Sequence, residues 1–289
     1  LSKPDIIITN TKIKKFNLKL RKKISKRPFL IFYTSGTTAE PKGVCHDFRT
    51  LIDNAIIFNM HTKLSQQTRF LSFLPMGYMA GFLNSVLSPL LTGGTIVILR
   101  KFGAWEMFNL LNLIIEKKIN TIWLVPSIIN YLNNLKLSLK IKKQIKDTLK
   151  NIFVGTAPYH DSLKKTFQKK FRIASLESYG MTEILLISSN QQGKKNYGSG
   201  KLLPNVNYKI LNGEICFKTN TSFKGYYEKN SIIKNGNKRW FSTGDIATVK
   251  NRYLTIKGRK KNLIIKDGVN ISPIEIENLI LKITKTKKC

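Results

Sequence analysis

Short apolar runs alternate with longer amphipathic stretches as far as about residue 200. Thr95–Leu99 (TIVIL) and Thr121–Val125 are continuously apolar, as strands buried on both faces are. Trp105–Lys117 instead spaces its apolar residues as an amphipathic helix does. This alternation predicts an α/β fold with a largely parallel sheet and flanking helices. It also predicts strands at Phe29–Tyr33, Phe70–Leu74 and Ile152–Val154, and helices at Phe48–Met60, Leu83–Leu91 and Asp161–Phe171.

Beyond about residue 200 the apolar runs shorten, and turn pairs such as Asn212-Gly213 separate them. This pattern predicts a smaller, mainly β lobe, and Pro273 is expected to open a helix that runs to about Leu281. The expected strands are Asn207–Ile210, Glu214–Phe217, Arg239–Ser242, Ile246–Val249 and Tyr253–Ile256. We divide the chain into a basic leader (1–28), an α/β core (29–200), a β lobe (201–257) and a final segment (258–289).

The chain is strongly basic, with 50 Lys and Arg against 16 Asp and Glu and a formal charge of +34. Such a charge raises the question of a nucleic acid or an anionic membrane as partner. Only nine of the 50 basic residues are Arg, and the basic positions are scattered without an aromatic repeat between them. We therefore expect solvated faces and no dedicated nucleic-acid surface, and keep a nucleic-acid binder as a minor alternative.

Three cysteines form no CxxC pair, which is typical of a reduced, cytoplasmic protein with free thiols. The longest mainly apolar stretch, Phe82–Leu91, contains polar residues and Pro89 and is too short for a bilayer. We therefore expect a soluble protein without a transmembrane segment. Neither end of the chain has the pattern of a natural terminus, so we expect a fragment or a degraded gene.

A loop rich in hydroxyl groups follows the first expected strand. Tyr33–Gly43 has the sequence YTSGTTAEPKG. Small residues let backbone N–H groups approach phosphate oxygens, hydroxyls donate hydrogen bonds and the lysine adds a point charge. The spacing is not that of a Walker loop. The segment suits a polyphosphate, and an ordinary polar turn is the alternative.

Four further motifs carry candidate chemistry. Glu177–Glu183 (ESYGMTE) combines hydroxyls with a carboxylate, and Trp240–Asp245 ends in an aspartate able to accept hydrogen bonds from the two hydroxyls of a ribose. Gly155–Pro158 (GTAP) is a small-residue turn that equally fits a plain strand-to-helix connection. Gly258–Glu277 is a basic segment that leads into a helix.

Together these motifs resemble the signatures of the adenylate-forming superfamily, which holds acyl-CoA and aryl-CoA synthetases, nonribosomal peptide adenylation domains and luciferases. The resemblance covers about residues 29–281. It implies an acid–thiol ligase that activates a small carboxylic acid with ATP and Mg²⁺, as in fatty acid metabolism. The acyl-adenylate would then pass its acyl group to a thiol. CoA is the expected acceptor, and the thiol of an acyl carrier protein is the alternative.

The resemblance also implies roles for single residues. Thr182 would bond the α-phosphate, Glu183 would hold Mg²⁺, and Lys42 completes the catalytic candidates. Asp245 would hold the ribose hydroxyls and Arg259 the ribose or a phosphate. Contacts to the β- and γ-phosphates would come from Thr34, Ser35, Gly36, Thr37, Thr38 and Lys42. The adenine and acyl pocket would be lined by Gly155, Ala157, Pro158, Tyr179 and Gly180. Lys261 would be the hinge of a mobile lid whose first part is residues 258–289.

Some features depart from the pattern of the superfamily. Tyr78 takes the place where the superfamily often has His, which weakens inference about the acid. His46 follows the phosphate loop and could lie near a nucleotide, but a position at the surface is the expectation. No residue matches the lysine of the complete lid, and the leader is shorter than the usual N-terminal subdomain. We therefore expect this chain to bind nucleotide weakly and to adenylate poorly alone, and a non-catalytic remnant is the remaining alternative.

Overall fold

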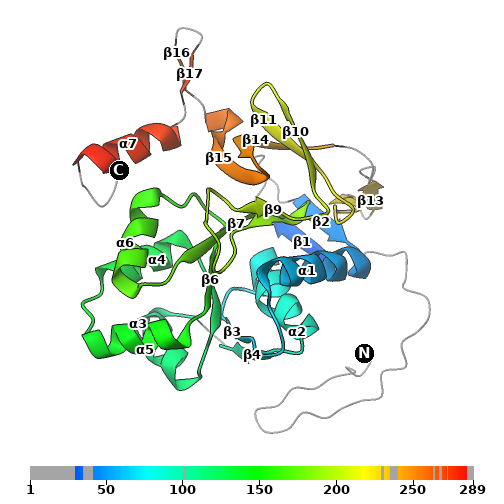
Figure 1. The fold of residues 1–289 in the computed structure, drawn as a ribbon. Coiled ribbons are helices and arrows are strands. Elements are labelled where there is room, and N and C mark those ends of the chain that lie inside the picture. Colours follow the sequence, from blue (N-terminus) through cyan, green and yellow to red (C-terminus); the bar gives the residue numbers. More distant parts are fainter. Residues whose placement is uncertain are drawn as a thin grey trace, which may run out of the picture.

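The computed structural model describes residues 30–34, 42–99, 102–228, 231–234, 240–262, 264–266, 269–271 and 273–284. At its centre is a sheet of eleven strands (Figure 1). One part consists of β3 (Arg69–Ser72), β4 (Thr95–Ile98), β5 (Thr121–Leu124), β6 (Asn151–Val154) and β7 (Ser175–Met181). These five strands are parallel and lie in the order β4-β3-β5-β6-β7. The parallel layer expected from the alternating pattern is confirmed.

Consecutive residues of the parallel strands pack on opposite faces of the sheet, since side chains alternate along a strand. The helices beside the sheet are α1 (Phe48–Thr62), α3 (Ala104–Glu116), α4 (Pro126–Asn134), α5 (Leu139–Thr148) and α6 (Asp161–Phe171). Ile122 and Ile152 belong to a core shared with helices α3 to α6 on one face. Trp123 and Phe153 pack on the other face against Phe58 of α1, with ring centroids 6.1 and 5.3 Å from that of Phe58. Helices therefore cover both faces (Figure 1).

The region of the helix expected at Leu83–Leu91 contains two helices of different type. A π-helix, η1, spans Ala80–Leu87, and α2 spans Ser88–Leu91. The Ser88 N–H donates to Leu83 O, which is the wider spacing of a π-helix. Pro89 lacks an N–H and sits in the first turn of α2, where an α-helical donor is not needed. The expectation of a helix holds, but its geometry changes before the proline.

The second part of the sheet is antiparallel. Its strands are β8 (Leu185–Ser189), β9 (Lys201–Leu202), β10 (Asn207–Leu211), β11 (Glu214–Lys218), β14 (Phe241–Lys250) and β15 (Tyr253–Arg259). They continue from β7 in the order β8-β9-β15-β14-β11-β10. The expected mainly β region is present, and it extends the same sheet through β9. The domain boundaries proposed from the sequence stay a prediction.

Strand β14 replaces two shorter strands that the sequence suggested at Arg239–Ser242 and Ile246–Val249. Thr243-Gly244-Asp245 fell between these two expected strands. The chain stays extended because it remains paired on both sides: Ser242 faces Cys216 of β11, and Asp245 faces Arg259 of β15. The expected break is therefore wrong, and Asp245 lies inside a strand.

A second, four-stranded antiparallel sheet is formed by β1 (Leu30–Thr34), β2 (Lys42–His46), β12 (Gly225–Glu228) and β13 (Ser231–Lys234), in that order. The C-terminal part contains the short helix η2 (Lys260–Asn262), the hairpin β16 (Ile264–Lys266) and β17 (Val269–Ile271), and α7 (Pro273–Thr284). Helix α7 begins at the proline that the sequence indicated. His160, the N-cap of α6, lies 3.7 Å from Glu277 (Nε2 to Oε2), so α7 contacts the α/β part.

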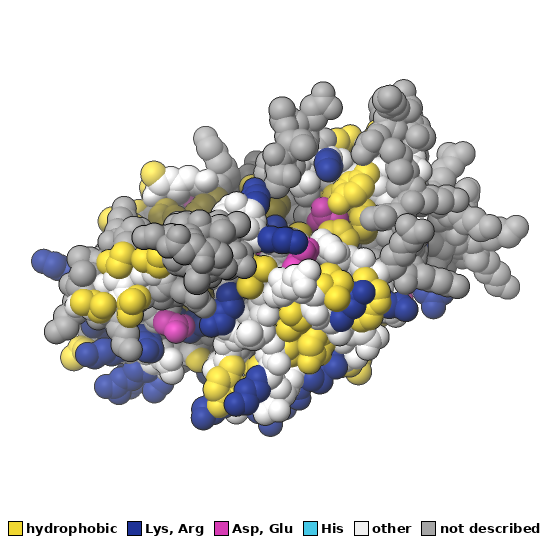
Figure 2. Space-filling view, turned by 90° about the horizontal axis from the view of Figure 1, so that it is seen from above, with side chains coloured by type: hydrophobic (Ala, Val, Ile, Leu, Met, Phe, Trp, Pro, Cys, Tyr) yellow, Lys and Arg dark blue, Asp and Glu magenta, His cyan; other side chains and the backbone are white. Residues whose placement is uncertain are grey.

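Figure 2 shows Lys and Arg side chains spread between hydrophobic and uncharged ones on one face of the described part. Within the described residues, no helix is both long and apolar enough to cross a membrane. Cys45 and Cys216 are buried free thiols, and Cys289 lies outside the described residues.

Candidate functional site

The two ends of the candidate phosphate loop are held by the β1–β2 hairpin. Thr34 ends β1 and is the direct cross-strand partner of Lys42, the first residue of β2. The Thr34 hydroxyl donates to the Lys42 carbonyl at 3.5 Å. Ser35, Gly36, Thr37 and Thr38 lie outside the described residues. Their proposed phosphate contacts therefore stay a prediction, as do those of Thr34 and Lys42.

Lys42 and Glu183 are joined through Tyr226 of β12. The Tyr226 hydroxyl donates to Oε1 of Glu183 at 3.1 Å, and the Lys42 ammonium lies 5.5 Å from the centroid of the Tyr226 ring. Tyr226 is paired with Val44 on β2, two residues beyond Lys42. The backbone N–H of Phe223 donates to the Glu183 carbonyl at 2.7 Å. Two candidate residues that are distant in the sequence therefore share one aromatic side chain.

Tyr179, Asp245 and Arg259 form a second cluster. The Tyr179 hydroxyl donates to Oδ2 of Asp245 at 2.6 Å, and Nε of Arg259 lies 2.7 Å from Oδ1. The Asp245 backbone N–H donates to the Thr243 hydroxyl at 3.0 Å, and Arg259 donates to the Thr243 carbonyl at 3.3 Å. Asp245 is only 3% exposed, so its carboxylate is fixed by these neighbours. Three residues proposed for the adenine and ribose are thus brought together from β7, β14 and β15.

Burial raises the pKa of the Asp245 carboxyl, and the Tyr179 hydrogen bond and the Arg259 charge act in the opposite direction. Burial, followed by the negative charge of Asp245, raises the pKa of the Tyr179 hydroxyl well above its ordinary value. Tyr179 therefore keeps its proton at neutral pH and acts as a hydrogen-bond donor to the carboxylate.

Thr182 is tied to the phosphate-loop strand by His46. Nε2 of His46 lies 2.7 Å from the Thr182 carbonyl oxygen. Burial lowers the pKa of His46 to about 4, so the imidazole is neutral at pH 7 and Nε2–H is the donor. The expectation of a surface histidine is wrong, because His46 is fully buried. The His46 ring lies edge-on to the Phe32 ring of β1, with centroids 6.4 Å apart, and the carbonyl of the neighbouring Cys45 accepts from Lys224 N at 2.8 Å.

The Gly155 turn follows β6 and lies against β7. A Cβ atom on Gly155 would be 3.0 Å from the Ser178 carbonyl oxygen and 3.3 Å from the Trp123 ring, so only glycine fits without a shift. Ala157 and Pro158 are exposed on the same turn, and Gly180 is half-buried on β7. Burial raises the pKa of the Tyr78 hydroxyl, and a hydrogen bond to the Thr156 side chain opposes that rise. Tyr78, from the segment expected to contact the acid, therefore meets this turn.

Lys261 is the middle residue of η2, the short helix that follows Arg259, and its side chain is exposed. The preceding Lys260 pairs with Glu214 at 3.2 Å (Nζ to Oε2). The hinge role of Lys261 stays a prediction. Neither Tyr226 nor the burial of His46 was expected from the sequence, which predicted no element at Gly225–Tyr227.

Glu183 is the proposed metal ligand. Within the described residues, no three His, Cys, Asp or Glu side chains gather as a metal-binding group. Mg²⁺ commonly takes one or two carboxylates and completes its shell with phosphate oxygens and water. A single carboxylate in the loop between β7 and β8, joined by Tyr226 to the strand that follows the phosphate loop, fits that kind of site.

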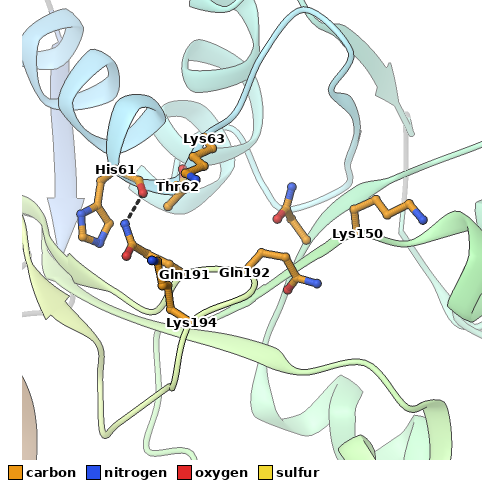
Figure 3. A pocket seen from close by; sticks show the side chains of 8 residues that line it. His61, Thr62, Lys63, Lys150, Gln191, Gln192 and Lys194 are labelled. Carbon is orange, nitrogen blue, oxygen red and sulfur yellow. Dashed lines mark hydrogen bonds between the residues drawn. The ribbon is translucent and has the colours of Figure 1, made fainter.

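A separate cavity of about 310 Å³ lies at the other end of β6 (Figure 3). None of the residues proposed for the nucleotide lines it. Asn151 begins β6 and lines the cavity, whereas Gly155 follows the end of the same strand. The cavity is lined by His61, Thr62, Lys63, Lys150, Asn151, Gln191, Gln192 and Lys194. The residues proposed for the nucleotide therefore lie outside this cavity.

Comparison with known proteins identifies the family. A family model described as AMP-binding enzyme matches residues 8–227. This chain belongs to the AMP-binding enzyme family. The resemblance drawn from the loop and strand motifs is thereby confirmed.

Curated proteins named as CoA ligases match most of this chain. A malonate–CoA ligase of Arabidopsis thaliana is 29% identical, over 91% of this chain and 47% of the relative. A 2-succinylbenzoate–CoA ligase of Bacillus licheniformis is 30% identical, over 87% of this chain and 54% of the relative. The chain spans about half the length of the curated relatives it matches.

Solved structures have the same fold over most of this chain. ATP-bound MatB from Rhodopseudomonas palustris superposes with a TM-score of 0.77 at 25% identity, over 87% of this chain and 52% of that protein. O-succinylbenzoate coenzyme A synthetase (MenE) from Bacillus subtilis, in complex with ATP and magnesium ion, superposes with a TM-score of 0.71 at 25% identity, over 89% of this chain and 55% of that protein.

Proposed function

We propose that the protein to which this chain belongs activates a carboxylic acid with ATP and transfers the acyl group to CoA. The observation that carries this proposal is the cluster of Tyr179, Asp245 and Arg259, joined at 2.6 and 2.7 Å. A buried carboxylate fixed by a cation and a tyrosine is suited to the two hydroxyls of a ribose. Membership of the AMP-binding enzyme family supports the same assignment.

In the first step a carboxylate oxygen of the acid bonds to the α-phosphorus of ATP, and pyrophosphate leaves. Lys42, Thr34 and the loop residues Ser35, Gly36, Thr37 and Thr38 would orient the β- and γ-phosphates. Thr182 would donate to the α-phosphate. Bound Mg²⁺ would supply positive charge that offsets the phosphate oxygens, and Glu183 would hold it. His46 fixes the Thr182 carbonyl, which steadies the backbone between Thr182 and Glu183.

In the second step the thiol sulfur of CoA bonds to the acyl carbon, AMP leaves with the electron pair of the broken C–O bond, and the thiol proton passes to solvent. Asp245 and Arg259 would keep the ribose in place through both steps. Gly155, Ala157, Pro158 and Gly180 would line the adenine and acyl pocket beside Tyr179, and Lys261 would allow the lid to turn between steps. The named relatives are CoA ligases, which supports CoA over a carrier-protein thiol.

The direct test measures binding of ATP to the chain by equilibrium dialysis with Mg²⁺. Acid-dependent exchange of pyrophosphate into ATP, which we expect to be slow for this chain alone, then reports adenylation. ATP should bind about tenfold more tightly than 2′,3′-dideoxy-ATP, since only ATP offers both hydroxyls to Asp245. Equal binding of the two nucleotides, or no ATP binding, would contradict the proposal. Mass spectrometry after addition of CoA or of a pantetheinylated carrier protein then separates the two acceptors.

A further inference from the structure

Tyr226 connects three segments that are far apart in the sequence. Its strand, β12, pairs with β2, so Tyr226 faces Val44 near the phosphate loop. Its hydroxyl donates to Oε1 of Glu183 at 3.1 Å, and its ring lies 5.5 Å from the Lys42 ammonium. The residue is itself held in place, because the Phe223 ring packs edge-on against it with centroids 4.9 Å apart.

The hydroxyl and the ring act on different partners. A carboxylate has two oxygens, so a hydrogen bond to Oε1 fixes the orientation of the group and leaves Oε2 for a cation. An ammonium within about 6 Å of an aromatic centroid is attracted to the ring face. Tyr226 therefore restricts the Glu183 carboxylate through its oxygen and the Lys42 ammonium through its ring.

We propose that Tyr226 is a positioning residue of the nucleotide site, which orients Glu183 toward Mg²⁺ through its hydroxyl and Lys42 toward the phosphates through its ring. This inference rests on the proposed function, since it needs ATP and the metal at this site. The contributions of the hydroxyl and of the ring are therefore separable. Loss of the hydroxyl weakens metal binding, whereas loss of the ring also weakens metal-free binding of the ATP phosphates.

The test uses Tyr226→Phe, which removes the hydroxyl, and Tyr226→Leu, which removes the ring as well. Tyr227→Phe is the matched control, because it deletes the hydroxyl of the next residue on the same strand. Mn²⁺ replaces Mg²⁺ as the probe, and its binding to the chain saturated with ATP is followed by electron paramagnetic resonance. Affinity for ATP is measured separately in EDTA, and circular dichroism checks the fold of each variant.

Tyr226→Phe should weaken Mn²⁺ binding about tenfold and leave metal-free ATP affinity unchanged. Tyr226→Leu should also weaken metal-free ATP binding about threefold. Tyr227→Phe should match the wild type in both. Unchanged Mn²⁺ affinity in Tyr226→Phe, or a loss of metal-free ATP affinity in that variant, overturns the inference and leaves the proposed function standing. Absence of ATP binding by the wild type overturns both. If Tyr226→Leu does not fold, Tyr226→Phe alone decides.

Discussion

Nε of Arg259 lies 2.7 Å from Oδ1 of Asp245, across two strands in which these residues are direct partners. The pairing places a cation beside a carboxylate that is almost fully buried. Tyr179 donates to the other carboxylate oxygen, so a ribose bound as proposed would have to share or replace contacts that already exist. Asp245 is thereby oriented before any ligand is present.

Asp245→Asn should remove the preference for an intact ribose. The amide cannot accept two hydrogen bonds at both former oxygen positions, so ATP affinity should fall about tenfold or more. Binding of 2′,3′-dideoxy-ATP should change much less. Titration of both nucleotides checks this, with Asp53→Asn on the exposed side of α1 as the control. Equal losses for both nucleotides would place Asp245 outside the ribose contact.

Lys42→Ala should act through the phosphates alone. Removing an ammonium that contacts the β- and γ-phosphates should weaken ATP binding about tenfold and leave AMP binding unchanged. Lys42 is exposed at the start of β2, so the change should not disturb the core. Lys63→Ala, at the exposed end of α1, is the control. If Lys42→Ala weakens AMP and ATP equally, the proposed phosphate role is wrong.

The pH dependence of stability should contain a contribution from His46. Its pKa is about 4 in the folded protein, below the ordinary 6.5 expected when the chain unfolds. The unfolded state therefore binds the proton more readily between these values, and stability is fully present above about pH 6.5 and is lost as pH falls toward 4. At pH 5 the loss should be about 2 kcal/mol.

Urea unfolding of the wild type and His46→Gln at pH 7 and pH 5 isolates that contribution. Gln keeps an N–H donor for the Thr182 carbonyl but does not titrate, while all carboxylates are common to both proteins. The wild type should lose about 2 kcal/mol more than the variant between the two pH values. Parallel losses would show that His46 titrates normally.

Gly180→Ala should destabilise the β7–β8 hairpin. A Cβ atom at Gly180 would lie 2.4 Å from the Leu185 carbonyl oxygen, so the backbone must shift at a cost of about 2 kcal/mol. Gly77→Ala is the control, because nothing lies within 4 Å of the Cβ it would add. Urea unfolding compares the two, and an equal stability of both variants would contradict the close approach at Gly180.

Much of the α/β part was predictable because burial imposes a regular pattern there. The helix expected at Asp161–Phe171 has those bounds as α6, and Thr121–Val125 contains β5. Helix α5 was not predicted: its exposed face is rich in lysine, and only Ile145 is fully buried in it, so its apolar signal is weak. The joining of the β region to the parallel sheet depends on the two residues of β9, too few for any periodicity.

Local motifs singled out Asp245 and Glu183 because one motif carries one kind of chemistry, and their roles stay proposals. The candidate site was not predictable where a residue acts through a partner from another part of the chain. Tyr226 gains its position from the pairing of β2 with β12, and His46 contacts the Thr182 carbonyl from a distant segment; no local pattern indicates either relationship. Membership of the AMP-binding enzyme family supports the motifs as a set, and the role of each residue stays a proposal until it is tested.

Strands β7, β8, β9, β15 and β14 follow one another without interruption in the large sheet, so Tyr179 and Asp245 are connected by a continuous ladder of backbone hydrogen bonds. If any one of these strands detached, the strands beside it would lose their backbone hydrogen bonds to it. The amides of all five strands should therefore exchange with deuterium as one cooperative unit. The entropic cost of bringing Tyr179 to Asp245 is therefore met when the chain folds. A nucleotide bound as proposed would not have to order these two side chains, so its binding would carry little of that cost.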